Sequence, residues 1–228
     1  MRQLTLGGYE TDPAWSPDGT MIMFDKDTWG ADDGIYVIGA DGPTGSGTLL
    51  VANGRGPSWS PDGSKIVYLD VSDNKIYLAD ATTGVQIGGA LAEGRNPCWS
   101  PDGSKIVFVK NYEIWGMNAD GSNQQKLTSP TGDLKDDELN WSPDGTKIVF
   151  ERIPDSIWIM NADGSGAHDL TPSKPNVRDP DYQMIQSRPV GGLVIPANKL
   201  EILAPYLALA GLVAAVSAVV AVRRRREA

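Results

Sequence analysis

The chain of 228 residues carries 20 basic and 29 acidic side chains, and its net charge of −9 argues against nucleic acid as a partner, because phosphate binding needs a basic surface. Its single cysteine and single histidine exclude a disulfide framework, a cysteine-rich zinc site and a histidine-cluster metal centre. Hydrophobic residues make up 40 % of the chain and aromatic residues 7 %, so the composition is that of a folded protein.

Residues 1–12 contain a short strand pattern, Gln3-Leu4-Thr5-Leu6, followed by a lead-in. The pattern resembles the fourth and last strand of the repeated units described below. The sequence before it contains no first, second or third strand of such a unit. The first residues also lack the apolar region of a signal peptide. We therefore expect the chain to be the C-terminal part of a longer, exported protein.

One phrase occurs four times between residues 13 and 171. Its copies are PAWSPDGTMIMF, PSWSPDGSKIVY, PCWSPDGSKIVF and LNWSPDGTKIVF. The four tryptophans are 44, 40 and 42 residues apart, at Trp15, Trp59, Trp99 and Trp141. A second phrase, of which residues 113–121 (EIWGMNADG) are one copy, follows each first phrase.

Each repeat predicts four β-strands. Runs such as Ile148-Val149-Phe150 are rich in β-branched and aromatic residues, and the Pro-Asp-Gly before them is a tight-turn sequence. The later Ala-Asp-Gly indicates a hairpin between the third and fourth strands. A period of about 42 residues with four strands per unit is typical of a β-propeller blade. We therefore predict an all-β propeller of four four-stranded blades, alone or within a larger ring, at about 13–50, 57–88, 97–128 and 139–171.

The phrases Trp-Ser-Pro-Asp-Gly-x-x-Ile-x-Phe and Ile-Tyr/Trp-x-Met-Asn-Ala-Asp-Gly resemble the repeat of TolB-type propellers, which share their architecture with WD repeats. The resemblance covers residues 1 to about 171. It implies a scaffold with a recognition surface for proteins, or an accessory domain of a peptidase, rather than a reaction of its own. TolB-like rings usually close with six or more blades, so four units are few.

The C-terminal part of the sequence predicts a membrane anchor. Proline-rich residues 172–201 form a tether, and residues 202–222 carry no charge and are long enough, at about 1.5 Å per residue, to cross a bilayer as one helix. The four arginines of the tail at 223–228 belong on the cytoplasmic side, which places the propeller outside the cytoplasm of a single-pass membrane protein. This end of the chain also resembles the anchors of archaeal surface proteins.

Two sets of repeated residues have structural explanations. We expect the tryptophans of the first phrase to pack between neighbouring blades. We also expect the repeated acids to serve the tight turns in which they lie, because an aspartate in a turn can hydrogen-bond to the nearby backbone. These acids are Asp18, Asp62, Asp102 and Asp144.

The best candidate binding surface is the mouth of the central channel. Residues just before each first strand face this mouth in a propeller, and here they combine both signs of charge. Trp29 is a tryptophan outside the repeated phrases and therefore a candidate exposed anchor. The mouth candidates are Asp12, Arg55, Arg95, Asn96, Asp137 and Glu138.

Two acidic loops are weaker candidates for a calcium site, because Ca²⁺ prefers oxygen ligands. One contains Asp25, Asp27, Asp32 and Asp33, and it fails the EF-hand pattern because Trp29 and Tyr36 occupy ligand positions. The other contains Asp133, Asp136, Asp137 and Glu138. Solvated loops are the simpler explanation for both, so we expect no cofactor, with calcium as the alternative.

Catalysis has little support in the sequence. His168 is the only histidine and belongs to an outer strand, Cys98 belongs to an inner strand, and no phosphate loop or dinucleotide fingerprint occurs. We therefore expect a non-catalytic scaffold that binds a protein or glycan. The alternatives are an accessory propeller of a peptidase or hydrolase whose catalytic domain lies elsewhere, and a hydrolase that uses carboxylates at the mouth. Unpaired end blades also predict association between copies.

Overall fold

The structure is a computed structural model, and it describes residues 3–5, 9–27, 33–45, 47–132, 134–153 and 156–171. These residues form sixteen strands in four antiparallel sheets of four strands each, which confirms the predicted all-β propeller. The described residues contain no helix long and apolar enough to cross a membrane. The predicted span at 202–222, like the tether and the basic tail, lies outside them.

In every sheet the four strands follow one another in chain order. The first sheet is β1 (Tyr9–Trp15), β2 (Met21–Asp27), β3 (Gly34–Gly39) and β4 (Thr48–Ala52). The second is β5 (Gly54–Trp59), β6 (Lys65–Asp70), β7 (Lys75–Asp80) and β8 (Gln86–Glu93). The third is β9 (Arg95–Trp99), β10 (Lys105–Lys110), β11 (Glu113–Asn118) and β12 (Gln125–Lys126). The fourth is β13 (Lys135–Trp141), β14 (Lys147–Ile153), β15 (Ser156–Asn161) and β16 (His168–Asp169).

The first strand of each sheet begins two to four residues earlier than the repeated phrase. β1 starts at Tyr9 rather than Pro13, and β13 starts at Lys135 rather than Leu139. The reason is a β-bulge before each tryptophan, across which the antiparallel pairing continues toward the N-terminus. The residues that the sequence places ahead of the first strands therefore lie inside them.

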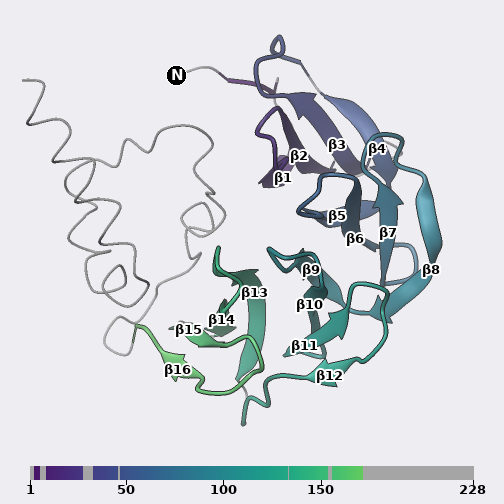
Figure 1. The fold of residues 1–228 in the computed structure, drawn as a ribbon. Helices are drawn as coiled ribbons and strands as arrows, with labels where there is room; N and C mark the ends of the chain where they lie inside the picture. The colour runs from purple at the N-terminus through teal and green to yellow at the C-terminus, as the bar shows by residue number, and fades with distance from the viewer. Residues whose placement is uncertain are drawn as a thin grey trace, which may run out of the picture. The chain divides into compact units, whose positions relative to one another are not determined.

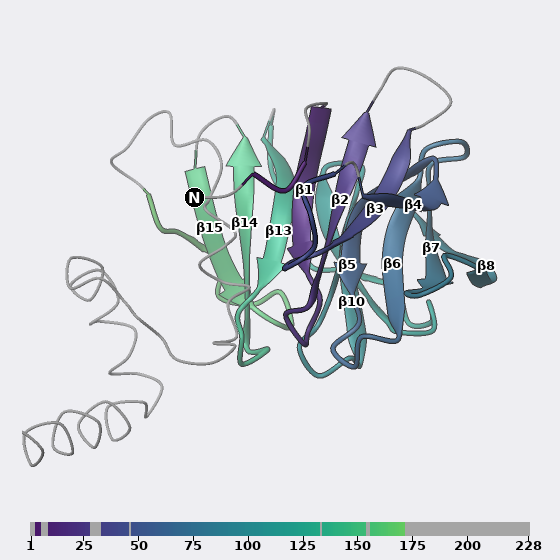
Figure 2. The ribbon, with the colours of Figure 1, turned by 90° about the horizontal axis from the view of Figure 1, so that it is seen from above.

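The sheets follow one another around an axis, with β1, β5, β9 and β13 innermost and the strands running along the axis (Figures 1 and 2). One edge of the sheets carries the beginnings of these innermost strands and is called the mouth edge. The opposite edge carries the Ser-Pro-Asp-Gly and Ala-Asp-Gly turns and is called the turn edge. Successive turns pack together, because the turn glycines Gly63, Gly103 and Gly145 face Pro17, Pro61 and Pro101 of the preceding sheet.

The hydrophobic core consists of layers between neighbouring sheets. Between the third and fourth sheets, for example, Val107 and Ile114 pack against Trp141 and Phe150. The alternation along each strand directs one set of side chains to the preceding sheet and the other set to the following sheet. A sheet in the middle of the series therefore buries both of its faces.

Leucines from the outer strands connect each sheet to the next. Leu50, Leu91 and Leu127 each pack into the core of the following sheet. Leu4 packs in the same way against Phe24, in the core of the first sheet, and its carbonyl accepts a hydrogen bond of 2.9 Å from the Gly45 N–H. Residues 3–5 form no strand, and they also contact the loop after β3 through Thr44 Oγ1, which donates a hydrogen bond of 2.8 Å to the Gln3 carbonyl.

The four repeated tryptophans do not share one environment. Trp99 and Trp141 are buried and Trp59 is half-buried, but 49 % of Trp15 is exposed. This differs from the expectation that all four tryptophans pack between blades. The physical reason is that Trp15 belongs to the first sheet of the series, and no sheet of the described residues precedes it in the chain.

Candidate functional site

The mouth edge is built on four backbone bulges. The residue three positions before each repeated tryptophan has a positive φ, with values of 51° at Asp12, 56° at Gly56, 49° at Asn96 and 38° at Glu138. Only one of the four is a glycine, although this conformation favours glycine. The bulges therefore hold polar side chains at the mouth edge at a cost in backbone strain.

Asp137 joins the third and fourth sheets at this edge. Its carboxylate lies 2.6 Å from Arg95 Nη2 and accepts hydrogen bonds of 3.0 Å from Asn96 Nδ2 and from the Glu138 N–H. Four of the sequence-predicted mouth residues therefore lie together. Arg95 uses one of its five N–H donors in this contact, so the cluster has donors left for a partner.

Tyr112 is a mouth residue that the sequence analysis missed. It follows Asn111 in the β10–β11 hairpin, and both residues have a positive φ, of 53° and 61°. Its exposed ring lies 4.6 Å from the Arg95 guanidinium and 4.4 Å from Lys135 Nζ. Two-residue hairpin loops favour Asn-Gly, because both positions need a positive φ. The tyrosine that stands in place of this glycine was the signal in the sequence that could have identified Tyr112 as a candidate.

On the first and second sheets the mouth edge holds a buried acid. Asp25 is 1 % exposed, and its Oδ2 accepts a hydrogen bond of 2.8 Å from the Gly56 N–H, while its Oδ1 has no partner among the described residues. Burial raises the pKa of Asp25 to about 8; the Gly56 hydrogen bond opposes this rise, and the charge of Asp12 adds to it. Arg55 lies 2.9 Å from the Asp27 carboxylate and 3.8 Å from that of Asp33.

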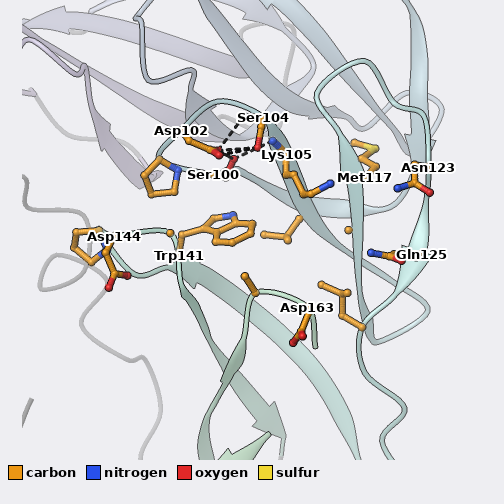
Figure 3. Close-up of a pocket in the computed structure, with 17 residues that line it drawn as sticks. Ser100, Asp102, Ser104, Lys105, Met117, Asn123, Gln125, Trp141, Asp144 and Asp163 are labelled. Atoms are coloured by element: carbon orange, nitrogen blue, oxygen red, sulfur yellow. Dashed lines mark hydrogen bonds between the residues drawn. The ribbon is translucent and has the colours of Figure 1, made fainter. Parts of the chain in front are cut away.

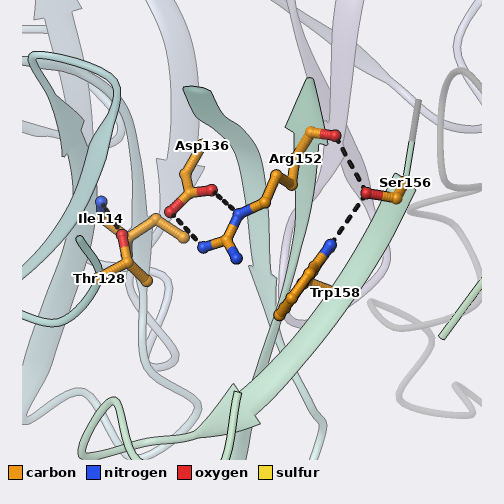
Figure 4. A network of polar contacts seen from close by, with 6 residues as sticks. All are labelled: Ile114, Thr128, Asp136, Arg152, Ser156 and Trp158. Atoms are coloured by element: carbon orange, nitrogen blue, oxygen red, sulfur yellow. Dashed lines mark hydrogen bonds and ion pairs between the residues drawn. The ribbon is translucent and has the colours of Figure 1, made fainter. Parts of the chain in front are cut away.

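Neither calcium hypothesis is supported by a set of ligands among the described residues. No set of three or more acids, cysteines or histidines within the described residues is arranged to hold a metal ion. Asp136 is buried and holds Arg152 through contacts of 2.6 and 3.0 Å, and the Arg152 guanidinium lies 4.0 Å from the Trp158 ring (Figure 4). Asp32 and Asp133, like Trp29, lie outside the described residues.

The repeated turn acids are occupied within their own turns. In the second sheet, Asp62 Oδ1 accepts hydrogen bonds from Ser60 Oγ at 2.6 Å and from Ser64 N–H at 3.0 Å. The Ser60 hydrogen bond is the largest cause that lowers the pKa of Asp62 to about 2. The other three sheets repeat the arrangement at Asp18, Asp102 and Asp144.

The cysteine and the histidine lie in surroundings that do not favour nucleophilic chemistry. The Cys98 thiol is buried, and this burial raises its pKa to about 11, which keeps it in the thiol form. His168 is exposed at the outer strand β16, where its Nδ1 contacts the Gly166 carbonyl at 2.9 Å.

Comparisons with known proteins identify the repeat. The TolB beta propeller domain matches residues 54–184 of this chain. A putative TolB from Agrobacterium tumefaciens has a similar structure, with 26 % identity, 70 % coverage of this chain, 64 % coverage of that chain and a TM-score of 0.59. TolB from Acinetobacter baumannii is 20 % identical, with 72 % and 41 % coverage and a TM-score of 0.50.

A structure of the nidogen/laminin complex shares the fold at 13 % identity, with 72 % and 65 % coverage and a TM-score of 0.60. In each of these three comparisons the chain spans less than two thirds of the length of the protein that it matches. A search of curated proteins found no match.

Proposed function

The chain belongs to the TolB beta propeller domain family, and from this premise we propose that it is a non-catalytic binding scaffold whose propeller lies outside the cytoplasm, anchored to the membrane by residues 202–222. Its partner is a protein or a glycan that meets the mouth edge. The observation that carries this proposal is the cluster of Arg95, Tyr112, Lys135 and Asp137, because strained backbone and charged side chains meet there at an exposed aromatic ring.

The strained backbone of Tyr112 is the argument that this cluster serves recognition. A bulky residue with a positive φ costs of the order of 1 kcal/mol or more, and such strain concentrates at functional sites. A glycine at position 112 would relieve the strain, and the ring of Tyr112 is 41 % exposed, so burial in the core does not explain it. The ring instead holds two cations at the surface, where tyrosine and arginine are typical anchors of binding interfaces.

The proposal of a non-catalytic role rests on the surroundings of the single cysteine and the single histidine, and the carboxylates at the mouth edge are the alternative catalytic groups. The buried thiol of Cys98 has a raised pKa, and His168 lies on an outer strand away from the mouth edge. The location outside the cytoplasm rests on the uncharged stretch at 202–222 and the arginines that follow it.

Cysteine labelling in intact cells tests the location and the recognition edge together. Leu134→Cys places a thiol at the mouth edge, on an exposed residue beside Lys135 that is not a member of the cluster, and Thr83→Cys places one in an exposed turn at the turn edge. A membrane-impermeant maleimide should label both variants without lysis, and the buried Cys98 contributes no background. Leu134→Cys should react several-fold more slowly in cells than after purification, because the bound partner covers it, whereas Thr83→Cys should react at the same rate in cells and after purification.

Each part of the proposal has its own contrary result. Labelling of both variants only after lysis would place the propeller inside the cytoplasm. Equal rates for Leu134→Cys in cells and after purification would remove the mouth edge as the recognition surface. Deletion of residues 202–222 should move the labelled chain out of the membrane fraction, and its retention there would contradict the anchor.

A further inference from the structure

A cavity of about 520 Å³ lies at the turn edge between the third and fourth sheets. Its apolar wall includes Val107, Met117, Leu127 and Trp141. Figure 3 shows the indole of Trp141 between Asp102 and Asp163, with Asp144 at another side of the opening. The cavity has the size of a ligand pocket and combines an apolar wall with an acidic rim.

A single glycine explains why the cavity lies between these two sheets. Gly116 pairs with Val107 in the middle of the third sheet. The residues in the same register of the other sheets are larger, and they are Val37, Leu78 and Ile159. Of these, Val37 and Leu78 pack in the layer between their own sheet and the following sheet. The third sheet therefore lacks a side chain that the repeat otherwise supplies, and the three atoms nearest to a Cβ built at Gly116 all belong to the Leu127 side chain, the nearest at 3.3 Å.

The rim of the cavity is negatively charged. Hydrogen bonds from serine and threonine hydroxyls lower the pKa of Asp102, Asp144 and Asp163, so these carboxylates are ionised at neutral pH. For Asp144 and Asp163 the described hydrogen bonds all go to Oδ1, which leaves Oδ2 for another donor. Lys105 is the cation of the lining, and its Nζ is 3.0 Å from Asn118 Oδ1.

We propose that this cavity binds an arginine side chain of a protein partner. The aliphatic part of an arginine fits the wall of Val107, Met117 and Leu127, and its planar guanidinium suits both the carboxylates at the rim and the indole of Trp141. The cavity lies at the opposite edge from the mouth. The scaffold therefore has a second attachment point, which acts independently of the partner at the mouth edge.

Two matched peptides test the proposal with the purified chain of 228 residues in non-ionic detergent. The probe is acetyl-Ala-Ala-Arg-Ala-Ala-amide, and its counterpart carries citrulline, which has the shape of arginine without the charge. Calorimetric titration should show binding of the arginine peptide, at least tenfold weaker binding of the citrulline peptide, and weaker binding of the arginine peptide at high salt. Gly116→Leu fills the cavity and should reduce the affinity at least tenfold.

The repeat supplies matched controls for the acidic rim. The double variant Asp144→Asn/Asp163→Asn should weaken binding at least tenfold. Asp62→Asn/Asp120→Asn changes the same kinds of turn, with the same hydrogen bonds, at positions that do not line the cavity, and it should leave the affinity unchanged. If Gly116→Leu does not fold, Gly116→Ala and the rim variant carry the test.

Three results would overturn the proposal. They are no heat of binding with the arginine peptide, equal binding of the citrulline peptide, and equal loss of affinity in the rim variant and its control. Cysteine labelling at the mouth edge does not depend on this cavity, so failure here leaves the proposed function standing.

Discussion

Trp15 and Trp141 come from copies of the same phrase but have opposite environments. Trp141 is 5 % exposed between the third and fourth sheets, and its Nε1 lies 3.4 Å from the Cys98 carbonyl of the preceding sheet. Trp15 is 49 % exposed at the edge of the first sheet. The phrase thus determines the strand and the turn that carry the tryptophan, whereas its burial depends on the neighbouring sheet.

Substitution of the two tryptophans gives the largest expected difference in the free energy of unfolding. Trp141→Ala should lower the free energy of unfolding by about 3 to 5 kcal/mol, because it leaves a cavity in a packed layer. Trp15→Ala should lower it by less than about 1 kcal/mol, because half of that side chain is already in water. Urea unfolding followed by far-UV circular dichroism measures both values. A large loss for Trp15→Ala would mean that another surface covers this edge of the first sheet.

The pH dependence of stability should differ between the core layer of the first two sheets, which contains Asp25, and the core layer of the last two sheets, which contains Val109. Asp25 occupies the register position that Val109 occupies in the third sheet. The unfolded Asp25 ionises near its ordinary value of 3.8, whereas the folded chain keeps the proton until about pH 8. The folded state binds more protons than the unfolded state in this range, so its stability falls as the pH rises from about 4 to about 8.

Asp25→Asn should remove this loss. Because the amide imitates the protonated acid, the variant should be more stable than the parent at pH 8 by several kcal/mol, since each unit of the raised pKa corresponds to about 1.4 kcal/mol, and nearly equal to it at pH 4. Val109→Ala is the control, since it should destabilise the chain by a similar amount at both pH values. Parallel pH profiles for the parent and Asp25→Asn would show that Asp25 is ionised in the folded state.

The smallest expected difference concerns the leucines that follow the outer strands. Leu127 packs against the fourth sheet, whereas 37 % of Leu170, its counterpart in the fourth sheet, is exposed. Leu127→Ala should lower the free energy of unfolding by about 1 to 2 kcal/mol, and Leu170→Ala by less than about 0.5 kcal/mol. Thermal unfolding of the two variants measures the difference. Equal losses would indicate that Leu170 is also covered.

Much of the fold was predictable because its signals are local. The Pro-Asp-Gly turns, the β-branched runs and the Ala-Asp-Gly hairpins each specify a few neighbouring residues. The fourfold repetition of the Trp-Ser-Pro-Asp-Gly phrase identified the blades and the TolB-like repeat. The mouth candidates Arg95, Asn96, Asp137 and Glu138 were also found from their position before the repeated tryptophans, and they lie together in the structure.

Other features required the packing of residues that are distant in the sequence. The exposure of Trp15, the burial of Asp25 and the approach of Arg95 and Lys135 to Tyr112 each depend on how one strand or sheet lies against another. Gly116 is visible in the sequence, but its effect appears only where the following sheet leaves space beside it. Turn and strand preferences act over a few bonds, whereas burial and charge pairing depend on distances that only the folded chain sets.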